Sequence, residues 1–81
     1  MTVHIRLFAA AKEFASRDRL VVEMSDGATI GDLRRRIVAD IPELATIARH
    51  SLWAVGTEYV GDDVVLHANA DVALIPPVSG G

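Results

Sequence analysis

The chain begins with a regular alternation of polar and apolar residues. Within residues 2–7 the apolar side chains Val3, Ile5 and Leu7 alternate with polar ones, so that they share one face. A period of two is typical of a β-strand that buries one face and exposes the other. We therefore expect residues 2–7 to form a half-buried strand.

An alanine-rich stretch follows, and here the apolar residues change to helical spacing. Alanine favours helix strongly, and Phe8, Ala11, Phe14 and Ala15 would share one side of such a helix. We expect a short helix that ends near Ser16.

The most regular amphipathic segment lies in the middle of the chain. Thr29 stands where a helix N-cap is expected, and Asp32 follows three residues later, beside the positive end of the helix dipole. Apolar residues then recur at helical spacing, namely Ile30, Leu33, Ile37, Val38 and Ile41. Pro42 disfavours helical geometry in the residue before it, so we expect the helix to end just before Pro42.

Shorter apolar runs between turn-forming residues indicate further strands. We expect these strands at residues 20–24, 52–55, 59–60 and 71–75. Residues 43–48 are interpreted as a separate short turn, with Leu44 and Ile47 facing inward. Residues 64–66 fit either a one-turn helix or a loop that plugs the fold.

This order of elements predicts an α+β domain built around one main helix. A helix with one apolar face needs a sheet to cover. A mixed sheet wrapped around that helix, with the first and last strands adjacent in its centre, is the β-grasp (ubiquitin-like) arrangement. A doubly wound sheet would need more helical crossovers. We expect the β-grasp domain to span residues 1–76 and a flexible Gly-Gly tail to span residues 77–81.

The composition excludes several classes of chemistry. The chain has 81 residues, a net charge of -3 and no cysteine, which removes disulfides, thiolate nucleophiles and cysteine metal sites. The acidic balance argues against nucleic acid as the main partner, and no apolar run approaches the length of a membrane span. The three histidines lack the spacing of metal ligands, and no serine has a catalytic His–Asp pattern. We therefore expect a cytoplasmic protein without metal, bound cofactor or side-chain catalysis.

Three other features have ordinary structural interpretations. The arginine triplet at residues 34–36 is interpreted as a solvated helix face, with a partner or phosphate contact as the alternative. Asp62 and Asp63 lack the spacing of a calcium loop and are assigned to a turn. Trp53 is expected to be half-buried in the core, with an interface role as the alternative.

The last residues carry the group best suited to chemistry. Pro76 and Pro77 end the last strand, and an uncharged segment follows that finishes with Gly80 and Gly81. Glycine has no side chain to collide with the walls of a narrow channel, so the α-carboxylate of Gly81 would be unhindered. A carboxylate can be adenylated and then attacked by a nucleophile. By elimination, Gly81 is the candidate reactive residue.

Strand alternation also predicts a docking surface beside this tail. Val72 and Leu74 share one face of the last strand, whereas Ile75 falls on the other. We expect Ile75 to face solvent and to contact a partner. The alternative is that a loop covers it.

The ending Val-Ala-Leu-Ile-Pro-Pro-Val-Ser-Gly-Gly at residues 72–81 closely resembles the end of the MoaD-type sulfur carriers, the small subunits of molybdopterin synthase. Residues 3–13 resemble the first strand and helix of that family, and residues 28–33 resemble the start of its main helix. The sequence departs from the family at Gly56, where Asn is frequent, and at residues 69–71, where Asn-Ala-Asp replaces a commoner Asp-Gly-Asp.

The resemblance implies a role in molybdenum cofactor biosynthesis. Gly81 would be adenylated by an E1-like, MoeB-type enzyme that uses ATP, and would then become a thiocarboxylate. Its sulfur would pass to cyclic pyranopterin monophosphate, and two such transfers would complete the dithiolene of molybdopterin. The carrier would assemble with a MoaE-type large subunit in a heterotetramer. The residues expected to contact partners are Gly80, Ser79, Val78, Pro77 and Ile75.

Other functions remain open on the sequence alone. A sulfur carrier for another pathway, such as the thiazole of thiamine, and a ubiquitin-like modifier joined to lysines would use the same chain end. A β-grasp binding module with an incidental Gly-Gly ending is a third alternative. The acceptor, pterin or lysine, separates the carriers, and an ATP requirement separates the carriers from the module.

Overall fold

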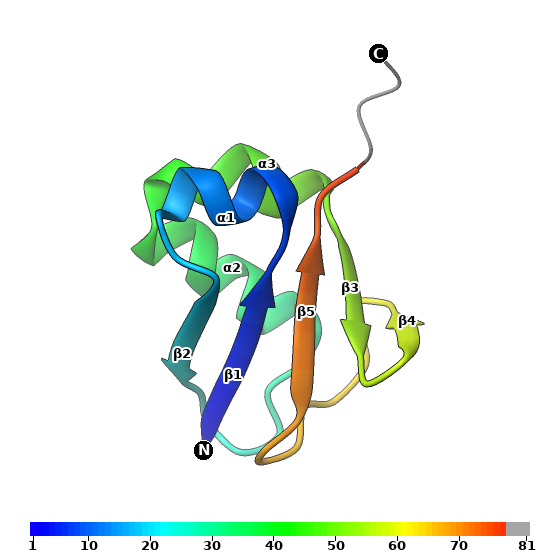
Figure 1. Ribbon diagram of the computed structural model, residues 1–81. Helices are drawn as coiled ribbons and strands as arrows, with labels where there is room; N and C mark the ends of the chain where they lie inside the picture. The colour runs from blue at the N-terminus through cyan, green and yellow to red at the C-terminus, as the bar shows by residue number, and fades with distance from the viewer. Residues whose placement is uncertain (78–81) are drawn as a thin grey trace.

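The structure is a computed structural model that describes residues 1–77 (Figure 1). A single five-stranded sheet forms one layer, and the helices lie on one side of it. In chain order the elements are β1 (Thr2–Leu7), α1 (Ala9–Ala15), β2 (Arg19–Glu23), α2 (Ile30–Asp40), the 3-10 helix η1 (Pro42–Leu44), α3 (Ala45–His50), β3 (Leu52–Val55), β4 (Glu58–Val60) and β5 (Asp71–Ile75).

The first and last strands lie side by side in the middle of the sheet, whose strand order is β2-β1-β5-β3-β4. β1 and β5 run parallel with Leu7 opposite Leu74, whereas β2 is antiparallel to β1 and β3 is antiparallel to β5. Gly56, with φ of 62°, permits the tight turn from β3 to β4. The prediction that the first and last strands of the chain are neighbours in the sheet is confirmed. The β-grasp arrangement of an α+β domain is confirmed with it.

The helix α2 supplies the centre of the core. Ile30, Leu33 and Ile37 are each at most 1% exposed. They belong to one cluster with the inward-facing residues of the sheet, which are Val3, Ile5, Leu7, Leu20, Trp53, Val72 and Leu74. Full burial of a large aliphatic side chain contributes roughly 1.5–3 kcal/mol, so these three residues of α2 contribute substantially to the stability of the fold.

Both ends of α2 follow the local signals in the sequence. The Thr29 hydroxyl accepts a hydrogen bond from the Asp32 backbone N–H (3.2 Å), and the Asp32 carboxylate accepts one from the Thr29 N–H (3.0 Å). This reciprocal capping box satisfies two backbone donors that would otherwise lack partners. The helix ends at Asp40, and Ile41 separates it from Pro42, as predicted.

The segment after α2 is more helical than the sequence predicts. In place of one short turn over residues 43–48, η1 is followed directly by α3, which continues to His50. Pro42 occupies the first turn of η1, where a missing N–H costs nothing. The predicted inward positions are confirmed, because Leu44 is fully buried and Ile47 packs partly buried against the core.

The apolar side predicted for α1 is wrong at its two aromatic residues. Phe8 is 42% exposed and Phe14 is 59% exposed, while Ala11 is fully buried. Phe8 is the N-cap, with extended backbone (φ -126°), and Ala9 follows with φ of 51°, so helical spacing does not apply from Phe8 onward. The helix approaches the core through the small side chain of Ala11, which leaves Phe14 at the flank.

Residues 61–66 form a loop that closes the fold beside the start of α2. The Ile30 N–H donates to the Val64 carbonyl (2.9 Å), and the Leu66 N–H donates to the Ala28 carbonyl (2.8 Å). Leu66 is 3% exposed, so it plugs the core. Of the two alternatives left open by the sequence, the loop plug is the one observed.

Trp53 is more buried than predicted, at 3% exposure. It lies on the helix-facing side of β3, with Leu74 of β5 opposite on one edge and Val60 of β4 opposite on the other. β3 therefore has a neighbouring strand on both sides at Trp53, and the side chain is buried.

Candidate functional site: the end of β5 and the open face of the sheet

The predicted docking residue Ile75 is the last residue of β5, and it is half-buried rather than fully exposed. It lies on the face opposite to Leu74, whose side chain is fully buried in the core. Pro76 and Pro77 follow directly, half-buried and exposed respectively. The other predicted site residues, Val78, Ser79, Gly80 and Gly81, lie outside the described residues.

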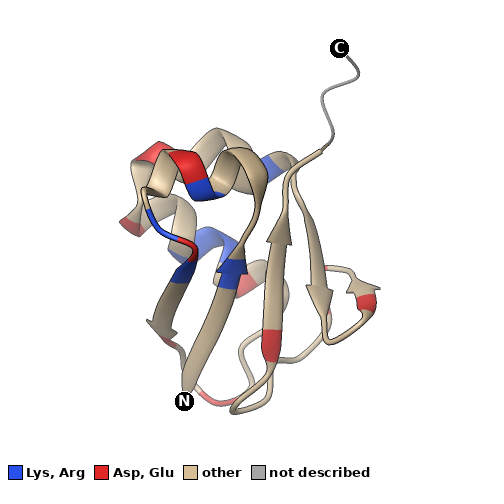
Figure 2. Cartoon of the chain, viewed as in Figure 1, with Lys and Arg blue, Asp and Glu red and all other residues tan. Residues whose placement is uncertain are grey.

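An apolar surface surrounds Ile75 on the sheet face opposite the helices. Leu52 pairs directly with Ile75, and Ala54 lies between Ala73 and Tyr59 in the register. Leu52 is 55% exposed and Tyr59 is 68% exposed, while the two alanines are covered by their larger neighbours. We call these five residues the outer patch, and Figure 2 shows few charged positions on the strands that carry it. The exposed part of the outer patch is therefore formed by Leu52 and Tyr59 with the half-buried Ile75, and exposed apolar side chains grouped in this way favour a protein contact.

The sequence predicted the shared face of Ala73 and Ile75 on β5, with Ile75 as the docking residue. Leu52 and Tyr59 were missed because their place depends on which strands pair and in which register. One signal was available, since an inward Trp53 puts its neighbours Leu52 and Ala54 on the opposite face of β3.

Basic residues border the outer patch where β1 ends. Arg6 pairs with Ala73 in the register, and its guanidinium makes two contacts of 3.0 Å with the Asp71 carboxylate. The same guanidinium lies 5.7 Å from the centroid of the Phe8 ring. Arg19 stands opposite Arg6 on β2. This border suits a partner surface that carries acidic side chains.

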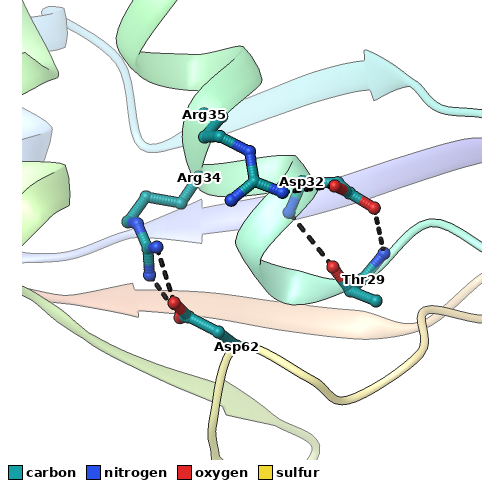
Figure 3. Close-up of polar contacts among 5 residues, drawn as sticks. All are labelled: Thr29, Asp32, Arg34, Arg35 and Asp62. Atoms are coloured by element: carbon teal, nitrogen blue, oxygen red, sulfur yellow. Dashed lines mark hydrogen bonds and ion pairs between the residues drawn. The ribbon is translucent and has the colours of Figure 1, made fainter.

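The arginine triplet at residues 34–36 belongs to a different surface. Its three guanidinium groups pair, in order, with Asp62, Asp32 and Asp40. Figure 3 shows the first two pairs together with the Thr29 cap. Each arginine has a carboxylate partner, which supports the interpretation of the triplet as a solvated helix face. The triplet lies on α2, on the side of the sheet opposite the outer patch.

The carboxylates of this second surface are structural. Hydrogen bonds from the Thr29 backbone and then from Arg35 hold the pKa of Asp32 below its ordinary value. Hydrogen bonds from Arg34 lower the pKa of Asp62 in the same way, and Asp62 raises the pKa of Arg34. The Asp62 carbonyl also accepts from the Gly31 N–H (3.0 Å), so Asp62 ties the loop at residues 61–66 to α2. Both shifts move the pKa of these carboxyls further from neutral pH, so neither carboxyl is suited to general acid chemistry there.

Two further observations concern the part of the chain that the structure describes. Within residues 1–77, no group of three or more histidine, cysteine, aspartate and glutamate residues could hold a metal ion. None of the helices in this range is long and apolar enough to cross a membrane.

The topology and the open sheet face define a ubiquitin-like β-grasp protein. The chain belongs to the ThiS family, whose sequence model matches residues 5–81. It is similar over its whole length to the molybdopterin synthase sulfur carrier subunit of Chlamydomonas reinhardtii, at 35% identity over 83 residues, with 100% of both chains covered. The resemblance to MoaD-type sulfur carriers is thereby confirmed.

Solved structures show the same fold. The crystal structure of SAMP1, a small archaeal modifier protein from Haloferax volcanii, covers 100% of both chains with a TM-score of 0.85 and 27% identity. A complex of subunits 1 and 2 of the molybdopterin-converting factor from Helicobacter pylori contains a chain that matches with a TM-score of 0.72 and 22% identity, again with 100% of both chains covered. At 22% identity, the match to the Helicobacter pylori chain shows a shared fold only.

Proposed function

We propose that this chain is the sulfur carrier of a molybdopterin synthase, and that Gly81 carries the sulfur as a thiocarboxylate. The observation that supports this most directly is the similarity to sulfur carrier subunits over the full length of the chain, through to Gly80 and Gly81. The outer patch adds support, because it leaves an apolar docking surface beside the strand that leads into the chain end.

The chemistry follows from the properties of a carboxylate. A carboxylate oxygen is a poor leaving group, so an activating enzyme first joins Gly81 to the AMP portion of ATP and releases pyrophosphate. A sulfur nucleophile then attacks the carbonyl carbon and displaces AMP, which leaves the thiocarboxylate. Its sulfur passes to cyclic pyranopterin monophosphate, and two transfers complete the dithiolene. The chain itself binds no cofactor in this scheme, because ATP belongs to the activating enzyme.

The partners in this proposal are two proteins that use the same docking surface in turn. The MoaE-type large subunit receives Pro77, Val78, Ser79 and Gly80 in its active-site channel and contacts Ile75 and the outer patch, in a heterotetramer. The E1-like, MoeB-type enzyme docks on the same patch to reach Gly81. Complexes of subunits 1 and 2 are known for the Helicobacter pylori molybdopterin-converting factor, which supports the first pairing. A cytoplasmic location for the carrier is part of this proposal.

The direct test is to incubate the chain with the activating enzyme, ATP and a sulfur donor, followed by intact-protein mass spectrometry. We expect one terminal oxygen to be replaced by sulfur, and fragmentation should place the change on Gly81. A chain without Gly81 should keep its circular dichroism spectrum and lose sulfur transfer to the pterin precursor. If the shortened chain still supplied sulfur, or the label lay on another residue, the carrier mechanism would be wrong.

A second candidate function is protein modification. The similarity to SAMP1, named as a modifier, favours it over the thiamine thiazole pathway and over a simple binding module. The two functions share the activated glycine and differ in the acceptor. Incubation of the activated chain with cell extract would show lysine-linked products for a modifier and dithiolene formation for a sulfur carrier.

A further inference from the structure

Lys12 is the only lysine of the chain, and the other permanently cationic side chains are arginines. An arginine guanidinium does not lose its proton in proteins, whereas a lysine amine can act as a nucleophile. The α-amino group of Met1 lies at the far end of β1 from α1 (Figure 1). It donates a hydrogen bond of 2.7 Å to the Met24 carbonyl, and the Met1 side chain is only 5% exposed. Lys12, on the exposed side of α1, is therefore the accessible amine of this protein.

The surface beside Lys12 is a cationic hollow of about 310 Å³. Arg6, Phe8, Lys12 and Arg19 contribute to its lining, and Asp18 is the carboxylate among them. Arg6 is already paired with Asp71, but neither Lys12 nor Arg19 forms an ion pair within residues 1–77. The hollow thus holds uncompensated positive charge in a chain whose net charge is -3. It suits a small anionic group attached to an apolar segment.

The carboxyl end of a second copy has this chemistry. It is an uncharged run of proline, valine, serine and glycine that terminates in an anion, whether as a free carboxylate or as an acyl-adenylate. β1 and β5 are parallel neighbours, with Leu7 opposite Leu74, so α1 and Pro77 follow their strands at the same end of the sheet (Figure 1). The hollow also shares Arg6 and Phe8 with the border of the outer patch. Two copies that meet at this end bring an acyl donor and an acceptor amine together.

We propose that Lys12 is the acceptor for acyl transfer from the activated Gly81 of a second copy, an inference that rests on the activation of Gly81 proposed above. The deprotonated Lys12 Nζ attacks the Gly81 carbonyl carbon. A C–N bond forms, the bond from that carbon to the AMP oxygen breaks, AMP leaves, and the nitrogen loses a proton to water. No group is oxidised or reduced. The product is an amide-linked dimer with a single type of linkage.

The test uses the full chain with a mercaptoethanesulfonate thioester at Gly81, which keeps a negative charge at the chain end and examines the acceptor without the activating enzyme. Each new amide bond releases one thiol, and we expect a dimer whose mass, once its remaining thioester has been hydrolysed, is that of two chains less one water. Trypsin should release a branched peptide in which residues 7–17 carry residues 50–81 through Lys12. Lys12→Arg should slow dimer formation at least about tenfold, because it removes the positioned amine. The matched control joins Lys12→Arg with Arg35→Lys, which moves the lysine to an exposed site on α2, and should stay within about twofold of Lys12→Arg.

Several results would overturn the assignment. These are a thioester that only hydrolyses, a dimer linked through Met1, and a relocated lysine that restores the original rate. Pyrophosphate release by the activating enzyme on the parent chain, measured separately, tests the proposed function. If that release fails, the sulfur carrier proposal is wrong, while the thioester experiment still decides whether Lys12 is the acceptor.

Discussion

Replacing Leu33 by alanine should lower the free energy of unfolding by about 3 kcal/mol. Leu33 is 0% exposed and lies in the core cluster between α2 and the sheet. Lost burial costs about 0.8 kcal/mol for each methylene, and the cavity adds to it, which gives the usual range of about 2–5 kcal/mol for such sites. With a urea slope of about 1 kcal/mol per M for a small domain, the midpoint should fall by about 3 M. Alanine is a better helix former than leucine, so helix propensity cannot account for a lower free energy of unfolding in Leu33→Ala.

The matched control is Leu52→Ala, which removes the same atoms from the outer patch. Leu52 is 55% exposed, so its replacement should cost less than about 1 kcal/mol. Circular dichroism in urea should therefore separate the two variants clearly. Equal midpoints for the two, or an unchanged midpoint for Leu33→Ala, would refute the assignment of α2 to the centre of the core.

Three further outcomes test the helix cap, the loop contact and the outer patch. Thr29→Ala should cost about 1 kcal/mol in thermal unfolding, and a cost equal to that of Thr29→Ser would contradict the role of its hydroxyl. Asp62→Asn should reduce stability at neutral pH. Arg34 lowers the pKa of Asp62 in the folded state. The stability contributed by this ion pair is therefore fully present above the ordinary Asp pKa of 3.8 and is lost as the pH falls through the lowered pKa. The difference in the free energy of unfolding between Asp62→Asn and the parent protein should therefore disappear in acid. A difference that stays constant from neutral pH to strong acid would refute the ion pair. Ile75→Asp should keep the fold and weaken binding to the MoaE-type subunit at least about tenfold by calorimetry, whereas Val21→Asp, on the same sheet face but on β2, should bind normally.

The parts of the fold that could be predicted are those whose signals are local. The alternation of Val3, Ile5 and Leu7 fixes a strand by itself, and the same residues are buried in the structure. Thr29 and Pro42 delimit α2 because capping and proline geometry act over a few residues. The fold class was then predicted from the order of the elements. Two strands before the main helix and three after it fit a β-grasp sheet better than a doubly wound sheet, which needs more helical crossovers.

The errors arise where tertiary contacts decide. Phe8 carries an aromatic side chain at a helical spacing, yet an N-cap with extended backbone turns it to the surface. Trp53 is buried because β4 and β5 both flank β3, and no local signal gives that order. The same holds for the outer patch, because Leu52 and Tyr59 meet Ile75 only through the register of three strands. Gly80 and Gly81 were predicted as the reactive end from chemistry and from the resemblance, and they lie outside the described residues.

The position of β5 suits the proposed role of the chain end as the reactive group. β5 has hydrogen-bonded neighbours on both sides, β1 and β3, and Val72 and Leu74 are fully buried under the helices. The described chain therefore leads from a central strand of the sheet, rather than from an edge strand, into its last residues. Pro76 follows at once and cannot extend the ladder, so the sheet ends at Ile75. The outer patch begins at that same residue. A partner that docks there starts from a fixed point, from which the number of residues to Gly81 is set by the sequence alone, and any partner with a channel of matching length can use the same carrier.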